Sequence, residues 1–371
     1  MSYPRLIFYT LFFSLCAVLS GETQDKRPEL PGGQYDKPYI RNMGKHVAVG
    51  GYIDMEFKWT EGVGNTFDQH RFIPFIYAEV TDRLHVSSEI EFEHGGKVPG
   101  DGEIKLEYAT VDFSFTQAFN FRAGVILSPL GSFNLLHDSP LNDLTERPTV
   151  SRQIIPSTLS ESGMGIFGTF YPSNKAVASY ELYLVNGFNA NVINSAGQLR
   201  IRSGRGSQKQ DNNNDKALVG RLGFSPRLGM NLGVSFHTGK FDVAGKKRLT
   251  ILAIDTKLSR SIFEFQGEYA KTSADGIVGK QQGAYAQTNI HFLHDHFLPG
   301  SVFTGIARWN WIDYDTSVTG SSERDFNIGL NFRPVEDAAF KLDYATTYNT
   351  PANGSRSAGI GRVFFSVATY F

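Results

Sequence analysis

The strongest indication of the fold lies in the last eleven residues, Gly361-Arg-Val-Phe-Phe-Ser-Val-Ala-Thr-Tyr-Phe371. Counting back from the C-terminus in steps of two gives one face made of Phe371, Thr369, Val367, Phe365 and Val363. This period of two predicts a β-strand. Terminal residues in water usually fray, whereas a strand that ends on a bare aromatic residue suits a membrane, where every sheet edge must be paired. The C-terminus therefore predicts a closed transmembrane β-barrel.

The composition is compatible with a barrel and argues against other classes. The chain has 371 residues, a formal net charge of −1 and a mean hydropathy of −0.24. A barrel hides its apolar face by alternation, so this low hydropathy does not argue against a membrane location. The 30 Phe and 16 Tyr residues suit interfacial girdles, and the 38 Gly residues suit tight turns. The near-neutral charge argues against nucleic acid as a partner.

The N-terminal segment has the features of an export signal. In residues 1–20, Arg5 precedes an apolar run that ends at Leu19, as in a secretory signal peptide. Its removal would also remove Cys16, the only cysteine, so the exported chain should have neither disulfides nor thiol chemistry. Residues 21–45 are polar and rich in Pro and Gly, and we interpret them as a periplasmic N-terminal extension. The barrel domain is then expected to span residues 46–371.

Short and long connections alternate along the expected barrel domain. Seven short connections are expected near residues 81–83, 116–118, 172–174, 226–228, 259–260, 294–300 and 334–337. Eight long ones are expected near residues 60–67, 96–102, 129–161, 189–216, 240–247, 273–282, 314–323 and 350–357. Fifteen connections imply about sixteen antiparallel strands, with short periplasmic turns and long extracellular loops, as is typical of outer-membrane barrels.

The strands carry an apolar face opposite a charged one. In residues 263–269, for example, Phe263 and Phe265 alternate with Glu264 and Glu268. A carboxylate facing hydrocarbon is costly, so the charged face must look onto water inside the ring. The expected lumen-facing residues are Glu89, Glu91, Glu93, Asp112, Arg122, Arg221, Glu264, Glu268, Arg308 and Lys341. This mixed lining predicts weak ion selectivity.

Two strands are apolar on both faces, which simple alternation does not explain. They lie at residues 70–80 and 177–188. Contact with a neighbouring subunit and contact with a loop folded into the barrel are both consistent with this pattern, and the sequence does not separate them.

The 33-residue connection 129–161 is long enough to have a function of its own. It intersperses apolar residues with the charged residues Asp138, Asp143, Glu146, Arg147 and Arg152. We expect this loop to fold into the lumen and narrow it, with acidic and basic groups filtering solutes by size and charge. The alternative is an ordered extracellular loop.

Several of these stretches resemble a known family. Residues 120–131 (NFRAGVILSPLG), 146–148 (ERP) and 161–168 (ESGMGIFG) are similar to the phosphate-selective-porin-like family of Gram-negative outer membranes. The resemblance implies a sixteen-stranded porin, usually a homotrimer, that lies among outer-membrane lipids and passes small anions or other small hydrophilic solutes. The C-terminal strand, with Phe365, Val367 and Phe371, resembles the terminal assembly signal of outer-membrane barrels, which implies recognition by the barrel-assembly machinery.

Other candidate sites are weaker. The basic loop 189–216 could concentrate anions at a channel mouth or could be a solvated surface. Residues 211–215 lack the Gly and Glu of a calcium loop, and His291, His294 and His296 lie at a strand end where their rings need not converge. Adjacent residues such as His137, Asp138 and Ser139 do not make a catalytic triad by themselves. We therefore expect no catalytic residue, no metal and no cofactor.

The sequence favours a porin for passive diffusion through a water-filled channel. A structural or adhesive surface barrel with a blocked lumen is the second hypothesis, and an outer-membrane hydrolase is the third.

Overall fold

The computed structural model describes residues 47–98, 101–206 and 208–371. The predicted signal peptide and N-terminal extension lie outside the described residues. The described residues form sixteen strands, as the sequence predicted: β1 (Val47–Thr60), β2 (Gly64–Thr81), β3 (Leu84–Val98), β4 (Asp101–Ser114), β5 (Asn120–Leu127), β6 (Ser160–Ser173), β7 (Ala176–Val185), β8 (Ala217–Arg227), β9 (Met230–Lys240), β10 (Arg248–Arg260), β11 (Phe263–Ala274), β12 (Gln281–Phe292), β13 (Val302–Asp313), β14 (Ser322–Val335), β15 (Ala338–Thr350) and β16 (Ile360–Tyr370).

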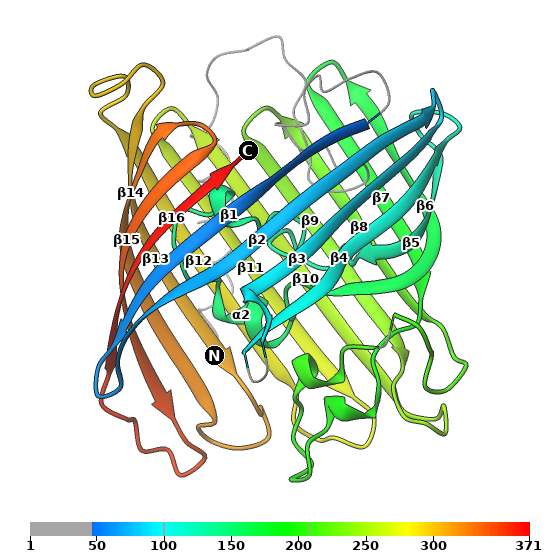
Figure 1. Ribbon diagram of the computed structural model, residues 1–371. Helices are drawn as coiled ribbons and strands as arrows, with labels where there is room; N and C mark the ends of the chain where they lie inside the picture. Colours follow the sequence, from blue (N-terminus) through cyan, green and yellow to red (C-terminus); the bar gives the residue numbers. More distant parts are fainter. Residues whose placement is uncertain (1–46, 99–100, 207) are drawn as a thin grey trace, which may run out of the picture.

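All sixteen strands form one closed antiparallel barrel (Figure 1). The first and last strands complete the ring, with Tyr52 opposite Tyr370 and Glu56 opposite Ser366. Beyond the end of β16, the Phe371 amide donates to the Gly51 carbonyl at 3.0 Å, and the Gly51 amide donates to the Phe371 carbonyl at 3.1 Å. The terminal strand therefore pairs with the strand that begins near His46, as predicted, and leaves no open edge at this position.

The alternation of side chains separates an apolar outer face from a polar interior. In β1, Ile53 and Met55 point outwards and are each 40% exposed, whereas Asp54 points inwards and is 2% exposed. The same alternation recurs around the ring and leaves many large apolar side chains on its outside. Such an outer face suits hydrocarbon, and the closed ladder pairs the edges of the sheet within the protein.

Most connections at one end of the barrel are shorter than those at the other, with three exceptions to the prediction. The connection expected to be short at 294–300 spans residues 293–301 and is longer than several of the long ones. The connection expected at 60–67 contains only residues 61–63, and where a long connection was expected at 96–102, β3 extends to Val98 and β4 begins at Asp101. Gly62 and Gly64 both have positive φ, which permits a tight turn where a longer connection was expected. The remaining long connections lie at that same end of the barrel.

The connection between β5 and β6, residues 128–159, folds into the barrel; we call it the inserted loop. It contains two short helices, η1 (Ser139–Leu141) and α2 (Thr149–Gln153), and Figure 1 shows α2 within the ring of strands. No helix among the described residues is long and apolar enough to cross a lipid bilayer.

Apolar contacts hold the inserted loop inside the barrel. It packs with the β7–β8 loop (residues 186–216, with helices η2, Ala190–Val192, and η3, Ile201–Gly204) against the inner wall. The shared core includes Val150, Ile154 and Ile155 of the inserted loop, Val192 and Ile201 of the β7–β8 loop, and Leu249, Ile251, Tyr285 and Ile312 of strands β10 to β13. An infolded loop was therefore the correct prediction.

The inner apolar residues of the two-sided strands also pack inside the barrel. Ile73 and Phe75 of β2 form a cluster with Tyr52 and Tyr370. Tyr183 and Val185 of β7 form a cluster with inward residues of β5 and β8.

Candidate functional site

The part of the lumen that the inserted loop leaves open contains a cavity of about 340 Å³, which we call the lumen cavity. The walls of β1, β2 and β3 lie on one side of it and the inserted loop lies on the other. The lining residues are Glu56, Lys58, His70, Arg71, Glu93, His94, Thr145, Glu146, Arg147, Arg152, Gln153, Ser157, Arg202 and Phe364. The lining contains five Lys or Arg residues, two His residues and three carboxylates, so the cavity is strongly charged with a modest positive excess.

Glu146 is the acidic centre of the inserted loop. Its Oε1 accepts a hydrogen bond from Arg362 Nη1 at 2.6 Å and lies 3.7 Å from Arg152 Nη1 and 3.9 Å from Lys58 Nζ. Burial alone would raise the pKa of Glu146, but Arg152, Arg362 and Lys58 outweigh it and lower that pKa below its ordinary value. Glu146 therefore remains an anion among three cations.

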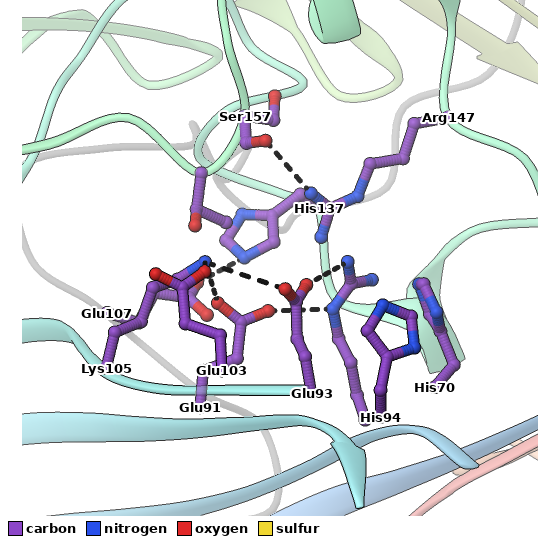
Figure 2. Close-up of polar contacts among 12 residues, drawn as sticks. His70, Glu91, Glu93, His94, Glu103, Lys105, Glu107, His137, Arg147 and Ser157 are labelled. Atoms are coloured by element: carbon purple, nitrogen blue, oxygen red, sulfur yellow. Dashed lines mark hydrogen bonds and ion pairs between the residues drawn. The ribbon is translucent and has the colours of Figure 1, made fainter. Parts of the chain in front are cut away.

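Arg147 is held by the backbone of its own loop and keeps unused donors. Its Nη1 donates to the Ser157 carbonyl at 3.2 Å, and Figure 2 shows this contact between the two labelled residues. The Nε and Nη2 atoms have no hydrogen-bond partner among the described residues. Burial and the nearby Arg71 lower the pKa of Arg147, although an arginine side chain stays protonated in proteins. Both unpartnered atoms are buried, so what Arg147 contributes to the cavity is its positive charge.

The facing wall carries a network of ion pairs. Arg71 of β2 donates to Glu91 at 2.8 Å and to Glu93 at 2.9 Å. Lys105 of β4 lies 2.5 Å from Glu91 and 3.6 Å from Glu103 (Figure 2). These ion pairs neutralise most of the positive charge of Arg71 and Lys105, so this wall does not present a continuous row of unpaired basic side chains.

Two of the five candidate constriction residues fix the loop to the barrel and do not line the cavity. Asp138 is buried and accepts a hydrogen bond from the Tyr370 hydroxyl at 2.9 Å. Asp143 accepts from Asn289 at 2.7 Å, from Asn331 at 3.2 Å and from Arg333 at 3.4 Å. Glu146, Arg147 and Arg152 do line the cavity.

Three of the candidate lining residues also contact the inserted loop. Glu268 accepts hydrogen bonds from the amides of Ser132 at 2.9 Å and Phe133 at 3.2 Å. Lys341 Nζ donates to the Ser139 carbonyl at 2.6 Å, and Arg308 Nη2 donates to the Glu146 carbonyl at 2.7 Å. These inward-facing charges from β11, β13 and β15 hold the loop in the lumen.

The other candidate lining residues point inwards in pairs along the wall. Arg122 donates to both carboxylate oxygens of Asp112 at 2.7 and 2.6 Å, and Arg221 does the same with Asp255 at 2.6 and 2.7 Å. Glu264 lies 3.0 Å from Lys257. Glu89, Glu91 and Glu93 share the inward face of β3, where Glu89 and Glu91 are buried and Glu93 lies at the cavity.

Six charged or titratable residues of the cavity were absent from the predicted set, namely Glu56, Lys58, His70, Arg71, His94 and Arg202. Lys58 follows Asp54 and Glu56 in steps of two, and this alternation could have identified it. His70 and Arg71 are adjacent, yet both line the cavity, because a bulge in β2 shifts the register between Asp68 and Arg71. A strict period of two assigns adjacent residues to opposite faces and cannot detect this arrangement.

The remaining sequence candidates have local partners. His137 contacts Glu107 and the Asn134 carbonyl, whereas Asp138 contacts Tyr370, so the trio at 137–139 is directed at different parts of the wall. His291 contacts Thr304 at 2.9 Å. Asp211 pairs with Lys216.

The candidate assembly residues lie on the outer face of β16. Phe365 is 43% exposed and Phe371 is 56% exposed. The Phe371 ring stacks on Phe72 with centroids 5.8 Å apart and planes inclined by 9°. Val367 lies between them on the same face, opposite Met55 of β1.

Comparison with known proteins places this barrel in a familiar architecture. No protein-family model matches the chain. A protein of Aquifex aeolicus (strain VF5) described as uncharacterized is 28% identical over 337 residues, which cover 81% of this chain and 75% of that protein.

Similar solved structures include three outer-membrane barrels. The anion-selective porin from Comamonas acidovorans has a TM-score of 0.58 and 10% identity, with 88% of this chain and 99% of that chain covered. The outer membrane channel DcaP of Acinetobacter baumannii has a TM-score of 0.56 and 12% identity, with 88% of this chain and 97% of that chain covered. OmpT of Vibrio cholerae in its trimer form has a TM-score of 0.56 and 10% identity, with 88% of this chain and 99% of that chain covered. At such identities the likeness establishes the shared sixteen-stranded barrel fold.

Proposed function

We propose that this protein is an outer-membrane porin through which small hydrophilic solutes and ions diffuse passively. The observation that carries the proposal is the charged lumen cavity between the inserted loop and the β1–β3 wall of a closed barrel. A loop that is fixed inside a barrel by many polar and apolar contacts narrows the lumen, and we propose that the polar side beside it carries the passage. Passive diffusion needs only such a wet passage and no chemical step, so the proposed protein is not an enzyme.

The solutes are proposed to be small anions in modest preference to cations. Five Lys or Arg residues and three carboxylates line the cavity, which leaves an excess of positive charge. The wall arginines are paired with carboxylates, which limits the field that a passing ion experiences. Phosphate, which the resemblance to phosphate-selective porins suggests, is one candidate solute within this weak preference.

The location and assembly form the second part of the proposal. The apolar outer face of the barrel suits the outer membrane, and the predicted signal peptide and terminal Phe371 suit export and recognition by the assembly machinery. A homotrimer is proposed because trimeric barrels of similar fold exist.

A barrel with a blocked lumen is the second candidate, and one observation favours it. The apolar core shared by the inserted loop and the β7–β8 loop fills the lumen along β10 to β13. If the lumen cavity did not continue to both ends of the barrel, the protein would be a closed structural or adhesive barrel.

Planar-bilayer recording on the purified, refolded protein tests the proposal. Stable stepwise conductance is expected, and the reversal potential in a salt gradient should indicate a weak anion preference. Folded protein that inserts without any conductance steps would contradict the porin and favour the blocked barrel. Folding can be checked independently by the β-rich circular dichroism spectrum of the inserted sample.

A further inference from the structure

Two imidazoles and one carboxylate converge at the rim of the lumen cavity. Asp68 Oδ1 lies 2.8 Å from His94 Nδ1, and Asp68 Oδ2 lies 3.4 Å from His70 Nδ1. The centroids of the two imidazole rings are 5.5 Å apart, and Figure 2 shows His70 and His94 side by side. One ligand atom from each of the three residues can be chosen so that all lie within 4.8 Å of one another.

Local structure brings these side chains together from two strands. Asp68 and His70 are two residues apart on β2, next to the bulge that also turns Arg71 inwards. His94 lies within the register shift between Glu93 and Val98, near the end of β3, and has a φ of 52°, which is uncommon for a residue other than glycine. Bulges often redirect side chains near functional sites. Here the bulge in β2 and the register shift in β3 direct His70 and His94 towards Asp68.

We propose that Asp68, His70 and His94 form a binding site for a divalent transition-metal ion, for which Zn²⁺ is the probe. Imidazole nitrogen and carboxylate oxygen are the ligands that Zn²⁺ takes in proteins, and bonds of about 2.0–2.1 Å in a tetrahedral arrangement place neighbouring ligand atoms about 3.4 Å apart. The observed separations need only small side-chain rotations to reach that spacing. Three protein ligands leave the fourth position for water.

The surroundings are compatible with a bound cation. The His70, His94 and Asp68 side chains are 23%, 46% and 27% exposed, so an ion can reach them from the mouth of the barrel. Arg71 is the adjacent positive charge, and Glu91 and Glu93 already pair with it. His70 Nε2 lies 3.8 Å from Glu56, a carboxylate suited to orient the ring of a metal ligand.

The site suggests how the channel could respond to its surroundings, and this second step rests on the proposed function. A bound ion adds two positive charges beside the lumen cavity, which His70 and His94 line. The additional charge should attract anions and repel cations at the mouth. Metal binding would therefore strengthen the weak anion preference of the pore.

A competing ligand set shares His70. Asp54, Glu56 and His70 also have ligand atoms within 4.8 Å of one another, but this set is more buried and has a single imidazole. The two sets can be distinguished, because His94→Ala removes a ligand of the first only and Glu56→Gln removes a ligand of the second only.

Isothermal titration of Zn²⁺ into the full-length protein folded in detergent tests the site directly. We expect one Zn²⁺ per chain, with affinity lowered at least tenfold by His70→Ala, by His94→Ala and by Asp68→Asn. The double variant His294→Ala/His296→Ala, in the exposed β12–β13 connection, serves as the matched control and should bind as the wild type does. Wild-type affinity in His94→Ala, or loss of binding in the control, would overturn the assignment.

Bilayer recording tests the effect on the pore separately. Zn²⁺ should move the reversal potential towards anion preference in the wild type and not in His94→Ala, and a chelator should reverse the change. Binding without any change in a conducting channel would overturn the regulatory step. If the protein does not conduct at all, the proposed function fails, whereas the titration still decides whether the site exists.

Discussion

Arg147 and Arg202 donate hydrogen bonds to the same acceptor, the carbonyl oxygen of Ser157, each at 3.2 Å. Arg147 belongs to the inserted loop and Arg202 to the β7–β8 loop. Two like charges are thus held together at the edge of the lumen cavity by one backbone oxygen. This arrangement concentrates positive charge where the two loops meet, and it explains why the cavity lining is net positive although most wall arginines are paired.

The first prediction concerns charge selectivity. Replacing Arg147 and Arg152 together with Gln removes two of the five basic groups that line the cavity. We expect the reversal potential in a salt gradient to shift towards cations, because three carboxylates then face three basic groups. Lys175→Gln, in the exposed turn after β6, is the matched control and should leave the reversal potential unchanged. An unchanged reversal potential in the double variant would mean that ions do not pass the inserted loop.

A second prediction concerns how the loop is anchored. Glu268→Ala removes the acceptor of the Ser132 and Phe133 amides and leaves two amides without a partner, at a cost of about 1–3 kcal/mol for each one that stays buried. The inserted loop should become mobile, and single-channel recordings should show larger and noisier conductance. Asp82→Asn, in the exposed turn between β2 and β3, should record like the wild type. Quiet, wild-type conductance in Glu268→Ala would show that this anchor does not hold the constriction.

The pH dependence follows from Glu146. Its pKa is lowered because the surrounding cations outweigh the opposing effect of burial. A carboxylate with a lowered folded-state pKa contributes stability above its unfolded pKa and loses that contribution as pH falls through the folded value. Acidification to the ordinary range of a glutamate should therefore leave the Glu146 charge, and its effect on selectivity, in place.

Reversal potentials measured down a pH series can detect this behaviour. The contribution of Glu146 is the difference between the wild type and Glu146→Gln at each pH. That difference should persist through the usual glutamate range and disappear only below it. In Arg362→Gln, which removes the 2.6 Å partner, it should disappear at a higher pH. A difference that disappears at the same pH in both backgrounds would contradict the role of Arg362.

The fourth prediction concerns closure of the barrel. A Cβ atom at Gly51 would lie 2.4 Å from the Ile73 carbonyl oxygen and 2.7 Å from the Phe371 ring, so Gly51→Ala should lower the yield of folded protein in the membrane. Deletion of Phe371 should lower it as well, without altering the conductance of the barrels that do assemble. Gly305→Ala, whose added Cβ would lie 3.7 Å from its nearest neighbour, is the control for a tolerated change. Normal yields after Phe371 deletion would contradict its role as an assembly signal.

The sequence predicted the barrel well because local patterns determine it. Alternation in segments such as residues 263–269 assigns inner and outer faces, and turn residues separate successive strands, so the number of strands can be counted. The pairing of β16 with β1 follows from the need to leave no edge. The infolding of residues 128–159 could be expected from their length and from apolar residues such as Ile154.

The site was predicted less completely because its contacts link distant residues. Asp138 and Asp143 looked like constriction charges, but their partners, Tyr370 and Asn289, lie 232 and 146 residues away along the chain. No local pattern indicates which charged residue of a loop faces the wall and which faces the cavity. The bulge in β2 placed His70 and Arg71 on one side, so the convergence with His94 could not be read from a period of two.

The last strand has a consequence for the order in which the channel forms. Tyr370 of β16 bonds to Asp138 of the inserted loop, and Arg362 of the same strand bonds to Glu146. Both contacts need the final residues of the chain, which are synthesised after all other parts of the barrel. A barrel in which β16 has not yet joined β1 therefore has an inserted loop without two of its tethers. The pairing of β16 with β1 therefore closes the barrel and at the same time completes the attachment of the loop that narrows the lumen.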